Sequence, residues 1–197
     1  RLDDEALSTG IADAYGSCNL RSSQVGALSF FDEFDTRDNL PAQIRIEAGE
    51  DGASGPSYRF LFIAKGAGSA NKTSLSMLSK ALLEERSFDA FLAEKIAALG
   101  TAACPPYRLA VVVGGTSPEE NLSMLKLATT ELLDAALPFG PGEDEAHSRE
   151  RGWIRRDSYW EGRLMDHARR SGLGAQFGGS SLALDARVLR LPRHAGS

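Results

Sequence analysis

The spacing of apolar residues along the chain predicts several helices. In residues 3–15 apolar positions recur at helical spacing after an acidic first turn, so a helix is expected there. Residues 88–99 show the same spacing and stop at Gly100, where glycine can adopt the left-handed conformation that ends a helix. Three further segments have helical patterns, at residues 75–83, 118–133 and 159–171.

Other segments have the patterns of β-strands. Residues 60–64 and 109–113 are uninterrupted apolar runs, which are typical of buried strands. Residues 42–47 alternate apolar and charged side chains, as a half-exposed strand does, and residues 25–34 and 182–191 are also expected to be extended. Because strands alternate with helices, the sequence predicts an α/β (mixed α+β) fold, a layered sheet with flanking helices.

Two stretches interrupt this alternation. Residues 49–57 are rich in glycine, serine and aspartate and are expected to form a turn. Residues 139–148 are rich in glycine and acidic side chains, and we predict a mobile insertion over residues 139–158. With 197 residues, the chain is expected to form a single domain over residues 1–197.

The composition is that of a globular protein and excludes some functions. Hydrophobic residues make up 42% and charged residues 25% of the chain, and no apolar run is long enough to span a bilayer. The net charge is −5, which disfavours nucleic-acid binding despite a basic cluster at residues 149–156. Only two cysteines occur, which indicates a reducing compartment. The chain opens in an acidic amphipathic stretch without a signal peptide, so we expect it to be the interior of a longer protein.

The loop at residues 65–72 is a candidate anion site. It lies between an expected buried strand and an expected helix, a position that directs backbone N–H groups and a positive helix end at a ligand, and Lys65 and Lys72 add charge. It lacks the Walker spacing and the third glycine of the dinucleotide fingerprint. The loop alone leaves two alternatives open, anion binding and a structural turn.

The cysteines and histidines carry little information singly. Cys104 precedes two prolines in a loop, but a lone cysteine is more often an inert small hydrophobe. Cys18, on the flank of the first helix, is expected to have no function. His147 and His167 lack partners at metal-ligand spacing and are expected to be solvated.

Taken together, however, the motifs of this chain are specific. In order and spacing they resemble class I fumarate hydratases, and the resemblance covers nearly the whole chain. The segments that carry it are NLR at 19–21, RDNLPAQ at 37–43, FIAKGAGSANKT at 62–73, GTAACPPY at 100–107, GGTS at 114–117, GLGAQFGG at 172–179 and RLPRH at 190–194.

The resemblance implies an iron-sulfur cofactor. In this family three cysteines hold a 4Fe-4S cluster whose fourth iron is left free for substrate. Cys104 matches the second of these ligands, the first is expected upstream of Arg1, and the third is expected directly after Ser197. The chain alone is therefore expected to lack the cluster and to be inactive.

The resemblance also implies a reaction and a set of substrate contacts. The expected activity is the reversible hydration of fumarate to S-malate, with the open iron as Lewis acid. Arg21 matches an arginine that holds a substrate carboxylate, a task suited to its planar fork. Gly68, Asn71, Lys72 and Thr73 match the substrate-contacting loop. A carboxylate base is expected beside the missing first cysteine, so no catalytic residue is assigned here.

His194 and the expected assembly complete this interpretation. His194 is expected either near the active site or in a structural hydrogen bond. By resemblance the intact enzyme is a homodimer that acts on small dicarboxylates in the cytoplasm or the mitochondrion. No nucleic acid or membrane partner is expected.

Departures from the family pattern keep other functions open. These are Arg108 for a common histidine, Ser180 and Leu184 for a lysine and a histidine, Ala67 for a glycine, and Ala195-Gly196 in inverted order. Related enzymes on this scaffold dehydrate tartrate and similar hydroxy acids, so an L-tartrate dehydratase is one alternative. A non-catalytic carboxylate-binding domain, or a degenerate paralogue serving as an interaction surface, is the other.

Overall fold

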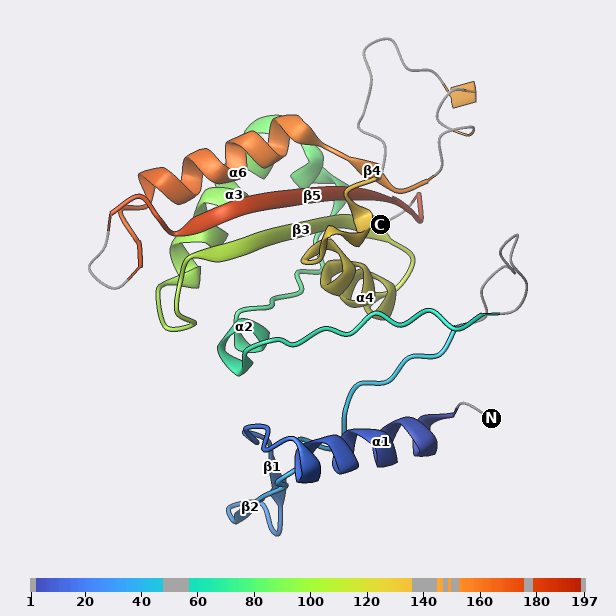
Figure 1. Cartoon of the computed structure of the whole chain (residues 1–197). Helices are drawn as coiled ribbons and strands as arrows, with labels where there is room; N and C mark the ends of the chain where they lie inside the picture. The colour runs from blue at the N-terminus through green and yellow to red at the C-terminus, as the bar shows by residue number, and fades with distance from the viewer. Residues whose placement is uncertain are drawn as a thin grey trace. The chain divides into compact units, whose positions relative to one another are not determined.

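The chain forms two compact units, which we describe separately. The computed structural model describes residues 3–47, 57–135, 145–146, 149, 153–175 and 179–195. One unit comprises Arg1–Phe62 and the other Ile63–Ser197. Both helices and sheets are present, which confirms the mixed α/β fold class (Figure 1). The assignment of both units to a single domain of a longer protein stays a prediction.

The first unit consists of a helix and a small hairpin. Helix α1 covers Asp4–Ser17, as expected, and begins where the Asp3 carboxylate accepts a hydrogen bond of 3.1 Å from the Ala6 amide. Strands β1 (Val25–Ala27) and β2 (Glu33–Asp35) pair antiparallel. The segment predicted to be extended over 25–34 is therefore folded back on itself between the two strands and is not one continuous strand.

Two of the predicted strands are absent. Residues 42–47 have no regular structure, and residues 60–64 are irregular and exposed, Phe62 at 86% of its surface. Both predictions were wrong for the same reason, because a strand exists only where a neighbouring strand accepts its backbone hydrogen bonds. An apolar run shows that burial is favourable, but it does not show whether a neighbouring strand is available to pair with it.

The second unit is built on a three-stranded sheet. Its strands β3 (Tyr107–Gly115), β4 (Arg155–Arg156) and β5 (Ala183–Arg193) lie in the order β3-β5-β4. β3 and β5 are parallel, with Leu109 opposite Ala186, and β4 is antiparallel to β5. β3 is therefore an edge strand of the sheet formed by the described residues.

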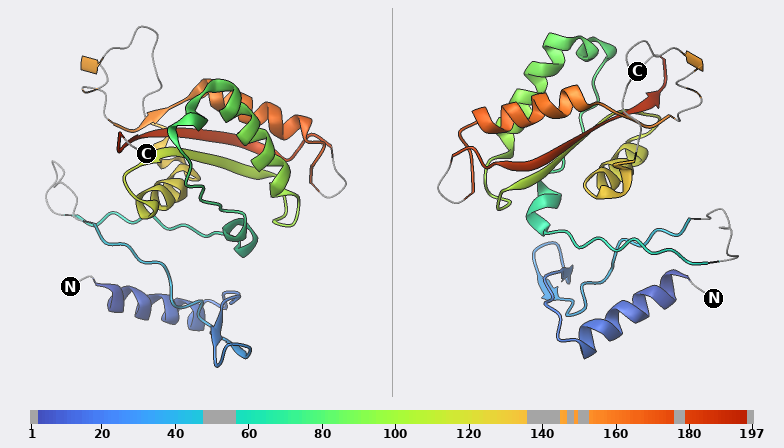
Figure 2. Two further views of the ribbon diagram at one scale, coloured as in Figure 1. Left: turned by 180° about the vertical axis from the view of Figure 1, so that it is seen from behind. Right: turned by 45° about the horizontal axis from the view of Figure 1, so that its top comes forward.

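Helices lie on both sides of this sheet. α3 (Glu85–Leu99) and α6 (Ser158–Arg170) pack together on one side, and α4 (Pro118–Ala128) lies on the other, as the two views of Figure 2 also show. The core is formed by side chains of α3, α6, β3, β5 and the residue directly before β5, namely Phe88, Leu92, Ile96, Leu109, Leu164, Ala168, Leu182, Ala186 and Val188. This core holds the parallel strands in place.

The helix predictions in this unit have mixed outcomes. The helices expected at residues 88–99 and 159–171 are confirmed, and Gly100 ends α3 with a φ of 59°. The helix expected over 118–133 ends at Ala128, and a 3₁₀ turn, η2 (Glu131–Leu133), follows. The helix expected over 75–83 is absent except for the 3₁₀ turn η1 (Lys80–Leu83).

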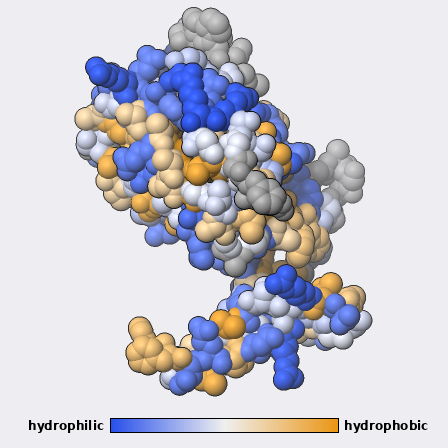
Figure 3. All heavy atoms as spheres, turned by 90° about the vertical axis from the view of Figure 1, so that its left-hand side faces the viewer, coloured by the Kyte–Doolittle hydropathy of each residue, from blue (hydrophilic) through white to orange (hydrophobic). Residues whose placement is uncertain are grey.

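The remaining expectations concern the loops and the surface. The turn predicted at 49–57 lies outside the described residues except for Ser57, and of residues 139–148 only 145–146 are described. Figure 3 shows hydrophobic and hydrophilic side chains interspersed on the face that it presents. Among the described residues, no helix is long and apolar enough to cross a membrane.

His167 was expected to be solvated, and this was wrong. Its side chain is only 13% exposed, and its Nε2 lies 2.9 Å from an Asp89 carboxylate oxygen. Arg163 donates to the same carboxylate, and this interaction, followed by the one with His167, holds the pKa of Asp89 below its usual range. The three residues join α3 to α6.

Candidate functional site

A groove runs along the edge strand β3 in the second unit. Its volume is about 860 Å³, and every residue of β3 from Tyr107 to Gly115 lines it. Side chains of α3, of the beginning of α4 and of residues 63–83 form its walls, and the last residues of β5 close one end. The groove thus brings together segments that are distant in the sequence.

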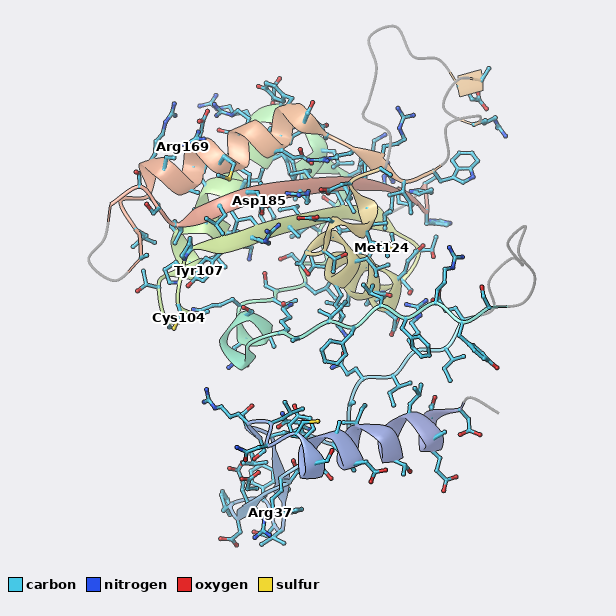
Figure 4. The ribbon with its side chains drawn as sticks, viewed as in Figure 1. Arg37, Cys104, Tyr107, Met124, Arg169 and Asp185 are labelled. Carbon is cyan, nitrogen blue, oxygen red and sulfur yellow. The ribbon has the colours of Figure 1, made fainter. Side chains whose placement is uncertain are left out.

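Cys104 lies on the lining of this groove, in the loop that leads into β3. Its thiol is exposed, and its backbone has a φ of 59°, with its amide donating to the carbonyl of Thr101 over 3.1 Å. The hydroxyl of Tyr107 donates to the carbonyl of Gly100 over 3.1 Å and so closes the loop (Figure 4). An exposed thiol on a hydrogen-bonded loop is not the buried, inert side chain of the alternative interpretation.

The candidate anion loop forms a short helix beside Cys104. Helix α2 covers Ala67–Asn71, so the predicted loop is helical and the helix expected to follow it is not formed. A Cβ added to Gly68 would lie 3.1 Å from the Cα of Ala103, the residue before Cys104. The absence of a side chain at Gly68 therefore allows α2 to approach the Cys104 loop. The sequence alone did not indicate this close contact.

The other residues of the predicted substrate loop are distributed around α2. Lys72 and Thr73 line the groove, and Asn71, at the end of the helix, is exposed. Lys65 also lines the groove, where partial removal from water and the charge of Lys126 hold its pKa below the usual range. Positive charge therefore gathers along this wall.

Arg21 belongs to the first unit. Its side chain is exposed, and its backbone carbonyl accepts a hydrogen bond of 3.3 Å from Nδ2 of Asn39. The Oδ1 of Asn39 also accepts from the amides of Ser23 and Gln24, at 2.7 and 2.9 Å. The segment after Arg21 is thus fixed by one asparagine, whereas the proximity of Arg21 to the groove stays a prediction.

The opposite end of the groove has features that sequence reasoning missed. Gly114 and Gly115, at the carboxyl end of β3, have φ values of 99° and 92°. A Cβ on Gly115 would lie 2.7 Å from Oδ1 of Asn121, and one on Gly114 would clash with the backbone carbonyl of Leu191. Here the GGTS motif allows β3 and β5 to approach each other and α4 to begin.

Helix α4 starts at this turn with reciprocal capping. The Ser117 hydroxyl accepts from the Glu120 amide over 3.1 Å, and the Glu120 carboxylate accepts from the amide and hydroxyl of Thr116. Hydrogen bonds from Thr116 keep the pKa of Glu120 below its usual range. Ser117 is therefore the N-cap of α4.

Substitution of Gly114 tests how much the turn depends on glycine. We expect Gly114→Ala to lower the free energy of unfolding by at least about 1–3 kcal/mol. Alanine at this position must adopt a positive φ, and its Cβ collides with the carbonyl oxygen of Leu191. Gly162→Ala is the matched control, since Gly162 is exposed within α6 and a Cβ there meets nothing within 4 Å. It should instead stabilise by about 0.5–1 kcal/mol. Urea unfolding of both variants measures the difference, and equal effects would contradict the strained turn.

Cys104 and His194 lie at opposite ends of the parallel strands. Cys104 precedes β3, whereas His194 follows β5, and the two strands run in the same direction. At about 3.3 Å per residue, β3 alone separates the two ends by roughly 25 Å. The described residues therefore do not bring His194 to Cys104, although both line the groove.

Cys104 fits a metal site only as one ligand among others. Within the described residues, no group of three or more histidine, cysteine, aspartate or glutamate side chains could hold a metal ion. An exposed thiol at the groove can serve as a thiolate ligand of an iron-sulfur cluster if further ligands come from elsewhere. Cys18 is also exposed, but it belongs to the first unit.

Comparison with known proteins gives consistent matches. A family model described as fumarate hydratase (fumerase) matches residues 3–197. The chain is 48% identical to fumarate hydratase 2 of Leishmania major and 47% identical to the anaerobic class I fumarate hydratase of Escherichia coli K12, over 99% of its length in both cases. It is 43% identical to the mitochondrial fumarate hydratase 1 of Leishmania major. The chain spans about one third of the length of these relatives, 32–34%.

Proposed function

The chain belongs to the fumarate hydratase family, and we propose that it is part of a longer class I enzyme that interconverts fumarate and S-malate with a 4Fe-4S cluster. The observation that carries this proposal is the exposed Cys104 thiol on the groove, within a chain 47% identical to a class I enzyme. The three relatives described above are all named as fumarate hydratases.

In this proposal Cys104 contributes one thiolate to the cluster. Its exposure and its place on a hydrogen-bonded loop support this role, because a ligand must be deprotonated and reach the metal. Two further cysteines come from residues outside the chain. When bound, the cluster supplies a Lewis acid for a substrate oxygen.

The residues of this chain bind and orient the dicarboxylate. Arg21 holds one carboxylate through its planar guanidinium, and Lys72 and Thr73 offer a charge and a hydroxyl on the groove wall. Gly68 allows α2 to approach the Cys104 loop, and in this proposal Gly68 and the exposed Asn71, at the end of α2, are further substrate contacts. The proton-transferring base lies outside the chain, so the chain alone is inactive.

Two properties of the intact protein accompany the proposal. We expect a homodimer, as the resemblance implies, and a cytoplasmic or mitochondrial location, in line with the relative whose name includes "mitochondrial". Of the residues that depart from the family pattern, Ser180 and Leu184 are exposed and are not among those that line the groove. Arg108 does line the groove in β3, where it pairs with Asp185.

The full-length protein, purified and reconstituted without oxygen, tests the proposal. We expect about four irons per chain for a 4Fe-4S cluster and hydration of fumarate that is much faster than dehydration of L-tartrate. Iron analysis and turnover with both substrates provide the measurement. Faster turnover of tartrate would reassign the substrate, and a protein without iron would favour a carboxylate-binding domain.

A further inference from the structure

The tip of the β1–β2 hairpin presents aromatic side chains to solvent. Phe30 and Phe31 lie between the two strands and are 94% and 89% exposed, and their rings meet edge to face with centroids 5.1 Å apart. Leu28, at the start of the same tip, is also exposed. Apolar residues that cluster on a surface in this way usually mark a place where another part of a protein docks, and aromatic residues contribute most to such contacts.

Hydrogen bonds restrain the backbone of this tip. The Leu28 amide donates to the Asp32 carbonyl over 2.8 Å, which closes the loop. The Ser29 hydroxyl donates to the Asp32 carboxylate over 2.7 Å and accepts from the amides of Phe31 and Asp32, at 3.3 and 3.2 Å. The backbone that carries the two phenylalanines is therefore ordered in advance, so little conformational entropy remains to be lost when a partner covers them.

The charge of the hairpin indicates the chemistry of its partner. Residues 25–35 include Asp32, Glu33 and Asp35 and contain no lysine or arginine. The apolar tip is thus bordered by negative charge, and the complementary surface is an apolar recess bordered by basic side chains. Two copies of the hairpin would instead place carboxylates against carboxylates, which disfavours a symmetric contact between them.

The area of the tip favours a partner within the same polypeptide. Phe30 and Phe31 together can bury roughly 300–500 Å². A stable contact between separate proteins takes about 800 Å² from each of them. A surface that is covalently linked to the hairpin needs less area, because the link gives it a high effective concentration. The chain spans only 32–34% of the length of its relatives, so the proposed full-length enzyme contains much polypeptide that this chain does not include.

We infer that the hairpin tip docks into an apolar recess, bordered by basic side chains, on the part of the full-length polypeptide that lies outside residues 1–197. This inference rests on the proposed function, in which the chain is part of a longer class I enzyme. It assigns the hairpin a role in the assembly of that enzyme, and the contact involves neither the substrate nor the cluster.

Hydroxyl-radical footprinting of the wild-type sequence tests this inference. The oxidation rates of Phe30 and Phe31, measured by mass spectrometry, should be at least about fivefold lower in the full-length protein than in the 197-residue chain, because the core of an interface is removed from water. Full-length protein unfolded in urea gives the rates for complete exposure. Equal rates in the native full-length protein and in the 197-residue chain would overturn the inference.

Substitution at the tip separates docking from a role within the chain itself. Phe30→Ser/Phe31→Ser should leave the Tm of the 197-residue chain within about 2 °C of the wild-type value, because both side chains are exposed there. The same double substitution should lower the Tm of the full-length protein. Leu132→Ser is the matched control, an exposed apolar residue outside the hairpin, and should change neither Tm. Equal decreases for Leu132→Ser and the double variant, or a decrease already in the 197-residue chain, would contradict docking of the tip.

Oligomeric state distinguishes docking within one polypeptide from a contact between copies. In analytical ultracentrifugation the full-length double variant should keep the oligomeric state of the wild type, and its dissociation into smaller species would overturn the inference. The footprint requires neither iron nor turnover, so the two proposals can fail separately. Protected phenylalanines in a protein without iron would refute the proposed function alone, and exposed ones in an active iron protein would refute the docking alone.

Discussion

Replacement of Cys104 by serine is expected to remove both the cluster and the activity of the full-length protein. A serine hydroxyl is a much poorer ligand than a thiolate, and the loss of the Lewis acid costs several kcal/mol of transition-state stabilisation. We therefore expect turnover of fumarate to fall by at least about a thousandfold. The visible absorption of the cluster and the iron content, both measured without oxygen, should fall together with turnover.

Cys18→Ser provides the matched control for this experiment. Cys18 is the other exposed thiol of the chain and lies directly after α1 in the first unit. Its replacement should leave the cluster spectrum and turnover unchanged. A full cluster spectrum in Cys104→Ser would exclude Cys104 as a ligand, and loss of the cluster in Cys18→Ser would mean that the ligand was assigned to the wrong cysteine.

Replacement of Arg21 by alanine should damage turnover without removing the cluster. Truncation of a charge that clamps a substrate carboxylate costs about 2–5 kcal/mol, which lowers kcat/KM roughly 30- to 5,000-fold. The fold should be retained, because Arg21 is exposed and only its backbone carbonyl takes part in the hydrogen bonds of the asparagine at position 39. Steady-state kinetics and the cluster spectrum of the same preparation give the two readouts.

Arg45→Ala controls for the loss of a positive charge in the same unit. The Arg45 side chain is 66% exposed and forms a surface ion pair with Glu47, an interaction worth little in water. Its removal should leave kcat/KM within about twofold of the wild-type value. Equal losses in both variants would point to a general electrostatic effect and would remove Arg21 from the substrate site.

The sequence predicted the elements whose signals are local. The end of α3 at Gly100 and the start of α4 at Ser117 follow from the conformation of glycine and from the capping hydroxyl, and both are confirmed. Strand β4, only Arg155–Arg156, could not be found, because two residues carry no periodicity. Its pairing depends on β5, which comes about 30 residues later in the chain.

The failed predictions at residues 60–64 and 75–83 have a common cause. Both segments are rich in apolar residues. An apolar pattern leads to a buried strand or helix only where another part of the chain covers it. In the structure Leu75 and Leu78 are about half exposed, at 43% and 51%, and a helix shorter than about 12 residues gains little stability without a packed apolar face. Burial is a property of two surfaces, of which a sequence pattern describes only one.

The candidate site, too, was predicted from the sequence only in part. Cys104 and the loop around Gly68 were found from their motifs, and the structure brings α2 to the residue before Cys104. The close contacts of Gly114 with Leu191 and of Gly115 with Asn121 were missed, because a pair of glycines in a sequence does not show which other segment approaches it.

The free edge of β3 has a practical consequence. Its centre, Val111-Val112-Val113, is a β-branched and uncharged segment with no neighbouring strand on one side among the described residues. Such an edge is a template for cross-β association between molecules, against which natural sheets usually place a lysine, a proline or a bulge. Solutions of the isolated chain should therefore be kept dilute, and a slow rise in light scattering or thioflavin fluorescence would report the assembly of β3 edges into fibrils.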